Sequence, residues 1–135
     1  MEVKVESKIG VLHSDCSRIY TFLSDCNNFQ HFANNEKIKD LRTDTDSCSF
    51  EVEGIGAISC RIVERKQDDL VKFQIENVQA ENIFLWIQLK SASAGITRVK
   101  LTTKLEAGMM LGMIIKKPLK NGMDRIVEAL EKICK

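Results

Sequence analysis

Hydrophobic and polar residues alternate along most of the chain, and this period of two is typical of β-strands with one buried face. The first such run ends near Val11, and its predicted inward positions are Val3, Val5, Ile9 and Val11, with Ser7 as a polar exception. The alternation returns at Lys37 and continues to Leu105, interrupted by short polar or glycine-containing turns. Such short spacers join consecutive antiparallel strands, since parallel neighbours need long crossovers. The pattern predicts an antiparallel sheet of about seven strands.

Two short helical patterns interrupt the alternation after the first strand. The first covers residues 14–25 and opens on Ser14 or Asp15, which can accept hydrogen bonds from free backbone N–H groups. The second opens on Asn27 or Asn28 and carries two aromatic residues, Phe29 and Phe32. Two aromatic side chains on so short a helix predict a lid or plug over an apolar interior.

A long helical pattern from Met109 to Lys135 ends the chain, with apolar residues on one side and charged residues on the other. Pro118 lacks an N–H and disfavours helix at Lys117, so we expect a kink or a new helix start there. A sheet followed by a helix long enough to lie across it encloses an apolar interior. The sequence therefore predicts an α+β fold that acts as a container.

Composition narrows the class of protein. The 135 residues predict a single domain, 1–135, and a net charge of +1 gives no reason to expect nucleic acid as a partner. The longest apolar run, residues 108–115, is far short of the roughly 20 residues of a membrane span, so no stable membrane insertion is expected. The start of the chain lacks the pattern of a secretory signal, which predicts a cytoplasmic location.

Cysteine and histidine give no metal motif. The five cysteines include no pair at CxxC spacing, which favours reduced, packed thiols. His13 and His31 are the only histidines, and neither is spaced with cysteines or carboxylates as in a zinc site. No metal and no permanent cofactor are expected.

The predicted order of strand, two short helices, six strands and long terminal helix resembles the helix-grip fold of the START-like (SRPBCC) superfamily. This superfamily includes polyketide cyclases and dehydrases, Bet v 1-like pathogenesis-related proteins and START domains. The stretch Ser14–Asp25 resembles the first helix of the family, and Gly95–Val99 resembles its turn into the last strand. The resemblance implies a cavity between the sheet and the terminal helix, and many members bind hydrophobic molecules there without chemistry.

Carried over by position, the resemblance implies pocket-lining residues on the sheet, the second short helix and the long helix. They are Phe29, Phe32, Phe50, Ile58, Phe73, Leu85, Ile87, Leu101, Thr103, Met110, Met113 and Ile114. Thr103, Ser7 and Asn77 are polar at inward positions, where a few polar groups can orient an apolar ligand. The alternative is that side chains simply fill the interior.

Three functions fit these patterns. The first is binding of a small hydrophobic or lipid-like molecule in the cavity. The second is an enzyme of the cyclase, aromatase or dehydratase type, in which His31, Ser7 or Thr103 transfers a proton, although no catalytic set is recognisable. The third is a protein-interaction module, for example a homodimer, acting through Phe84 and Trp86 on the convex face of the sheet. A bulge that turns Trp86 inward is the alternative for that residue.

Overall fold

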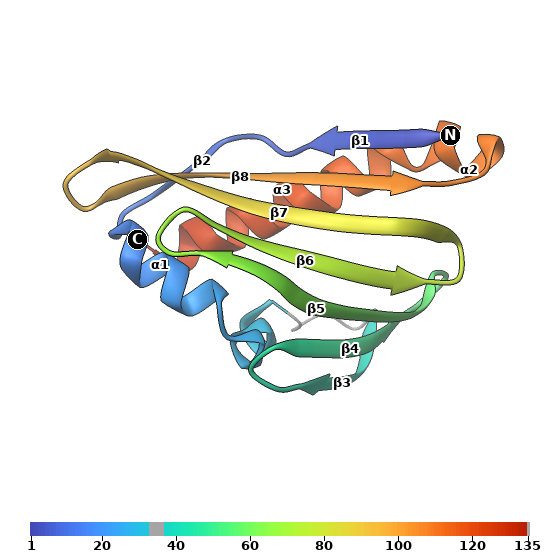
Figure 1. Ribbon diagram of the computed structural model, residues 1–135, viewed down its shortest axis with the longest axis horizontal. Helices are drawn as coiled ribbons and strands as arrows, with labels where there is room; N and C mark the ends of the chain where they lie inside the picture. The colour runs from blue at the N-terminus through green and yellow to red at the C-terminus, as the bar shows by residue number, and fades with distance from the viewer. Residues whose placement is uncertain (33–36, 135) are drawn as a thin grey trace.

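A computed structural model describes residues 1–32 and 37–134 and has an α+β fold, in which one curved sheet packs against a long helix (Figure 1). The elements in chain order are β1 (Glu2–Glu6), β2 (Gly10–Leu12), α1 (Cys16–Leu23), the 3₁₀ helix η1 (Cys26–His31), β3 (Ile38–Thr43), β4 (Ser47–Val52), β5 (Gly56–Lys66), β6 (Leu70–Asn77), β7 (Ala80–Ser93), β8 (Ile96–Glu106), α2 (Met109–Ile114) and α3 (Lys116–Ile133). This order confirms the predicted succession of elements.

The eight strands of the described residues form one antiparallel sheet. Its order is β1-β8-β7-β6-β5-β4-β3, and β2 pairs with β8 beyond the end of β1. From β3 to β8 each strand pairs with the next along the chain, so the predicted succession of hairpins is confirmed. Glycines with positive φ serve the turns, including Gly54 at 84° and Gly95 at 72°. The pairing of β1 with β8 brings the first strand beside the last.

The expected first strand is two strands with a bulge between them. Pairing with β8 stops at Glu6 and resumes at Gly10 with the register changed by one residue. A change of one residue exchanges the two faces of a strand. Ile9 is therefore 63% exposed and Val11 is 44% exposed, and the prediction that both face inward is wrong. Leu12 takes the buried position in their place.

The two short helices form where the pattern predicts them, but the predicted residues do not cap their N-termini. Asp15 precedes α1, yet its carboxylate makes no cap; it accepts a hydrogen bond from the Gly95 N–H at 3.1 Å and so holds the β7–β8 turn. In η1, the carboxylate of Asp25 accepts a hydrogen bond from the Asn27 N–H at 2.9 Å. Asp25 is therefore the cap, and the prediction of Asn27 or Asn28 is wrong.

The terminal helical segment divides into α2 and α3 at Ile115, just before the predicted position. Pro118 has no N–H to donate to the carbonyl of Ile114, so one helical hydrogen bond is missing there. Beyond the break, α3 packs against β1, β2 and β8 through Met123, Val127 and Leu130. No helix of the described residues is both long enough and apolar enough to span a membrane.

Helices cover the concave face of the sheet from two sides. The long helix α3 lies along β1, β2 and β8, whereas α1 and η1 lie against β3, β4, β6 and β7 (Figure 1). The end of α3 meets the start of α1, where the His13 N–H donates to the Cys134 carbonyl at 2.9 Å. Fully buried side chains gather between α3 and the sheet: Val3, Leu12, Val99 and Leu101 come from the strands, and Leu130 comes from α3. The strip of sheet between the two sets of helices holds the candidate site.

Candidate functional site

A cavity of about 80 Å³ lies on the concave face of the sheet, where η1, α1 and α3 approach it. Its lining comes from seven elements and the segments that join them, and is composed of Phe22, Leu23, Asp25, Cys26, Asn28, Phe29, Phe32, Cys48, Cys60, Phe73, Ile75, Leu85, Ile87 and Ile126. The two polar side chains are already engaged: Asp25 caps η1, and the Asn28 amide donates to the Phe22 carbonyl at 2.9 Å. The remaining lining side chains are apolar or thiols, so the site suits an uncharged, apolar guest.

Four aromatic rings, Phe22, Phe29, Phe32 and Phe50, form a cluster at the η1 end of this cavity. Phe29 stacks on Phe50 with ring centroids 5.4 Å apart and an angle of 20° between the planes. Phe32 meets Phe22 edge-on at 6.1 Å and lies 6.0 Å from Phe29. The expected aromatic plug is therefore formed by η1 together with one ring from α1 and one from β4.

Three of the five cysteines meet in the wall of the cavity. Cys48 and Cys60 are opposite each other on β4 and β5, and their Sγ atoms are 3.0 Å apart. The Cys26 thiol of η1 is hydrogen-bonded to Cys48, and this bond together with burial raises the pKa of Cys26. The Cys26 contact lowers the pKa of Cys48, while the contact with Cys60 and burial raise it, to about 12 overall. Within residues 1–32 and 37–134, no group of three or more cysteine, histidine or acidic residues is arranged to hold a metal ion.

Five of the twelve residues predicted to line a pocket surround this cavity: Phe29, Phe32, Phe73, Leu85 and Ile87. Phe50 belongs to the aromatic cluster, and Ile58 is its partner across the β4–β5 pairing. Leu101 and Thr103 lie in the packed core instead, and the Thr103 hydroxyl donates to the Met123 sulfur at 3.0 Å. For the five predicted residues that do line the cavity, a role in ligand binding stays a prediction.

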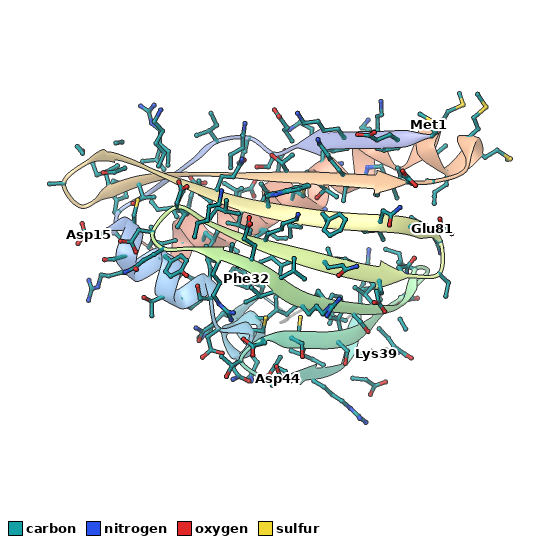
Figure 2. All side chains as sticks on the ribbon, viewed as in Figure 1. Met1, Asp15, Phe32, Lys39, Asp44 and Glu81 are labelled. Atoms are coloured by element: carbon teal, nitrogen blue, oxygen red, sulfur yellow. The ribbon has the colours of Figure 1, made fainter. Side chains whose placement is uncertain are left out.

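The prediction that Met110, Met113 and Ile114 line the cavity is wrong. Their side chains are 85%, 74% and 69% exposed. The residues of this segment that pack on the core are Leu111 and Ile115, which lie on the opposite side of the helical turn. In Figure 2 several sulfur atoms project outward around Met1, at the end of the molecule that carries α2. A helical period alone cannot tell which side of a short, almost wholly apolar helix faces inward.

The polar residues proposed for proton transfer or for orienting a ligand do not line the cavity. Ser7 fills the bulge after β1, where its Oγ accepts from the Leu101 N–H at 2.9 Å and donates to the Lys8 carbonyl at 2.7 Å. The Asn77 amide donates to the Ala57 carbonyl at 3.0 Å and braces the end of β5. The His31 ring packs against Phe22, with centroids 5.6 Å apart, outside the lining.

Phe84 and Trp86 lie on the convex face, as their alternation with Leu85 predicts. Each ring is half-buried, and the Lys72 ammonium lies 4.6 Å from the Phe84 centroid and 5.0 Å from the Trp86 centroid. Lys104 lies 6.0 Å from the Trp86 ring. Cation–π contacts thus cover the pair, and the alternative that Trp86 turns into the cavity is wrong.

A larger depression of about 320 Å³ lies over β3 to β6, but its lining is polar. It includes Arg42, Arg61 and Glu76, and the Arg61 guanidinium donates to the Gln74 side-chain oxygen at 2.8 Å. Charged side chains and wide exposure to water make this depression unsuitable for an apolar guest. The smaller cavity is the candidate site.

Several solved structures of low sequence identity share the fold of this chain. A START superfamily protein from Mycobacterium smegmatis is 13% identical, with 97% of this chain and 96% of that one covered and a TM-score of 0.74. Norcoclaurine synthase from Thalictrum flavum, in complex with dopamine and hydroxybenzaldehyde, is 13% identical, with 98% and 86% covered and a TM-score of 0.75. The protein XoxI from Bacillus cereus is 10% identical, with 98% and 95% covered and a TM-score of 0.76. This protein has the START-like fold.

The START-like resemblance read from the sequence is thereby confirmed at the level of the fold. At these identities the likeness says nothing about ligand or activity. No protein family model matches the sequence, and no curated protein sequence matches it.

Proposed function

We propose that the protein binds a small apolar molecule in the cavity beneath η1. The observation that carries the proposal is the composition of the lining. Apolar side chains from α1, η1 and α3 and from the four neighbouring strands β4 to β7 surround one cavity. Burial of apolar ligand surface is the main driving force, at about 25 cal/mol for each Å² removed from water. Among the described residues of the lining, Asp25 is the one charged side chain, and its carboxylate already caps η1.

The size of the cavity restricts how a guest can enter. An apolar cavity of about 150 Å³ is enough to hold benzene, whereas this cavity measures about 80 Å³. A ring-sized guest therefore needs Phe29 or Phe32 to swing aside. Phe29 lies in the short helix η1 and Phe32 directly follows it. Phe29 stacks on Phe50 of β4, and the Thr43 hydroxyl of β3 donates to the Asn27 side-chain oxygen at 2.8 Å, so one ring contact and a few hydrogen bonds join this segment to the sheet. We expect the aromatic cluster to open when a guest binds and to pack against it afterwards.

Small aromatic compounds are the first class of guest to test. The similar fold of norcoclaurine synthase is seen with dopamine and hydroxybenzaldehyde, and aromatic rings pack favourably on phenylalanine side chains such as Phe29 and Phe73. The described lining side chains offer few free polar groups, which favours rings without hydroxyl groups, such as benzene, toluene and indole, over catechols.

Two matched variants test the site. Leu85→Trp puts a bulky ring into the cavity from β7, whereas Gln88→Trp puts the same ring on the opposite, exposed face of that strand. Chemical-shift changes of methyl and phenylalanine signals on titration with toluene and indole report binding. We expect saturable shifts in the wild type and in Gln88→Trp, and at least a tenfold weaker affinity in Leu85→Trp. Equal binding by both variants would place the guest elsewhere and refute the proposal.

A further inference from the structure

Cys48 and Cys60 line the cavity, but the proposed apolar binding makes no use of the chemistry of their thiols. The residues face each other directly across two paired strands, and their Sγ atoms are 3.0 Å apart. We propose that this pair is an oxidisable dithiol, which low-molecular-weight disulfides such as glutathione disulfide convert to a Cys48–Cys60 disulfide. The inference does not depend on the identity of any guest in the cavity.

The backbone already has the geometry that a disulfide needs. Residues directly opposite in an antiparallel pair have Cα atoms about 4.5–5.5 Å apart, and disulfides span Cα separations of about 4.4–6.8 Å. Both cysteines are free thiols in the structure. Their sulfur atoms need to approach by about 1 Å to reach the bond length of about 2.05 Å, which small side-chain rotations provide. The strands can remain paired while the bond forms.

The order of steps follows from exposure. Cys60 is half-buried and Cys48 is only 5% exposed, so Cys60 reacts first with the oxidant. The Cys60 thiolate attacks one sulfur of glutathione disulfide, which gives a mixed disulfide and releases one glutathione. Cys48 then loses its proton to solvent and attacks the Cys60 sulfur, which releases the second glutathione. Two protein thiols are oxidised and one glutathione disulfide is reduced to two thiols, so electrons and protons balance.

The raised pKa of Cys48 makes the second step slow at neutral pH. Burial of the Cys48 side chain raises its pKa, so few Cys48 groups are thiolates, and the thiolate is the nucleophile. The rate of ring closure should therefore increase up to about tenfold for each pH unit between pH 7 and pH 9, while the mixed disulfide accumulates at the lower pH.

Cys26 offers the competing partner. It is hydrogen-bonded to Cys48, and a Cys26–Cys48 disulfide would tie η1 to β4. The β4–β5 pairing holds Cys48 and Cys60 in register on two strands, whereas Cys26 belongs to a separate 3₁₀ helix. We therefore expect Cys48–Cys60 to form in preference.

Peptide mapping distinguishes the two pairings. Full-length folded protein is treated with glutathione disulfide at pH 8, quenched with acid, alkylated and cut with trypsin without reduction. Cys48 and Cys60 lie in one tryptic peptide, residues 43–61, whereas Cys26 lies in another, residues 19–37. The proposed bond leaves peptide 43–61 lighter by two hydrogens and uncrosslinked, and cleavage after Glu51 or Glu53 then gives two joined fragments. A bond to Cys26 joins the two tryptic peptides.

The variants Cys26→Ser and Cys134→Ser should form the same internal bond as the wild type, whereas Cys60→Ser should keep one mixed disulfide or none. Two outcomes would overturn the proposal. One is a disulfide in the folded wild type that joins Cys48 or Cys60 to Cys16, Cys26 or Cys134. The other is retention of all five thiols by the folded wild type under conditions that oxidise the protein in urea. Both are read from the wild type, so a variant that fails to fold does not affect the test.

Discussion

At Gly10 the strand β2 passes close beneath Val127 of the long helix α3. A Cβ atom at this position would collide with Cγ1 of Val127 and lie 3.1 Å from Cγ1 of Val99. Val99 and Val127 are fully buried, so neither side chain can move into solvent. The substitution Gly10→Ala should therefore push α3 away from the sheet.

Overpacking of this kind costs about 1–3 kcal/mol of the free energy of unfolding. Val127→Ala removes the methyl group that collides, and by itself should cost about 2 kcal/mol through lost burial and the space left behind. In the double variant the new methyl at position 10 occupies part of that space. The double variant should therefore be more stable than the sum of the two single changes predicts, by about 1–2 kcal/mol.

Urea unfolding followed by circular dichroism measures these differences. With a slope of about 1–3 kcal/mol per molar urea, a loss of 2 kcal/mol lowers the midpoint by roughly 1 M. Gly122→Ala is the matched control, because a Cβ there meets no atom within 4 Å and alanine favours a helix by about 0.5–1 kcal/mol. Wild-type stability of Gly10→Ala, or simple additivity with Val127→Ala, would refute the proposed close packing of β2 and α3.

Three further predictions concern separate features. Met113→Lys should change the free energy of unfolding by no more than about 0.5 kcal/mol, because this side chain is 74% exposed. A loss above about 2 kcal/mol in urea unfolding would show that the Met113 side chain is buried and would contradict this prediction. Ser7→Ala should cost about 1–3 kcal/mol, because it leaves the buried Leu101 N–H without its acceptor; an unchanged urea midpoint would argue against this structural role. Asp124 accepts hydrogen bonds from the Lys120 ammonium and from the Lys8 N–H, and these bonds hold its pKa below the ordinary 3.8. The carboxylate therefore adds to the free energy of unfolding above pH 3.8, and this stabilisation is lost as the pH falls below that value. The melting temperature of Asp124→Asn should therefore be lower than that of the wild type at pH 6, with the gap closing toward pH 2; a gap that stays constant with pH would contradict this.

The strand pattern of the sequence predicted the sheet well, because each of its middle strands has one apolar face. Phe73, Leu85 and Ile87 have the inward positions that their alternation indicates, and Phe84 and Trp86 have the outward ones. Phe29 and Phe32 could be placed at the cavity from the sequence, because two large rings on a short polar helix need an apolar surface to cover. These predictions depend only on the spacing of apolar residues along a short stretch of chain, which can be read from the sequence alone.

Features that depend on contacts between distant segments could not be read in this way. The bulge at Ser7 arises from hydrogen bonds to β8, nearly a hundred residues away, and it reversed the predicted faces of Ile9 and Val11. The exposure of Met110 depends on which side of α2 meets the core. A thiol pair such as Cys48 and Cys60 becomes visible only when the register of β4 and β5 is known, although both residues had the inward parity.

Native mass spectrometry of the protein, purified without detergent and without added ligand, followed by extraction and identification of the bound molecule, tests the central claim most directly. A single apolar guest, present in the wild type and in Gln88→Trp but absent from Leu85→Trp, is the predicted result. The same guest retained by Leu85→Trp, or a wild type that carries no guest and takes up neither toluene nor indole, would contradict a binding function for the cavity beneath η1.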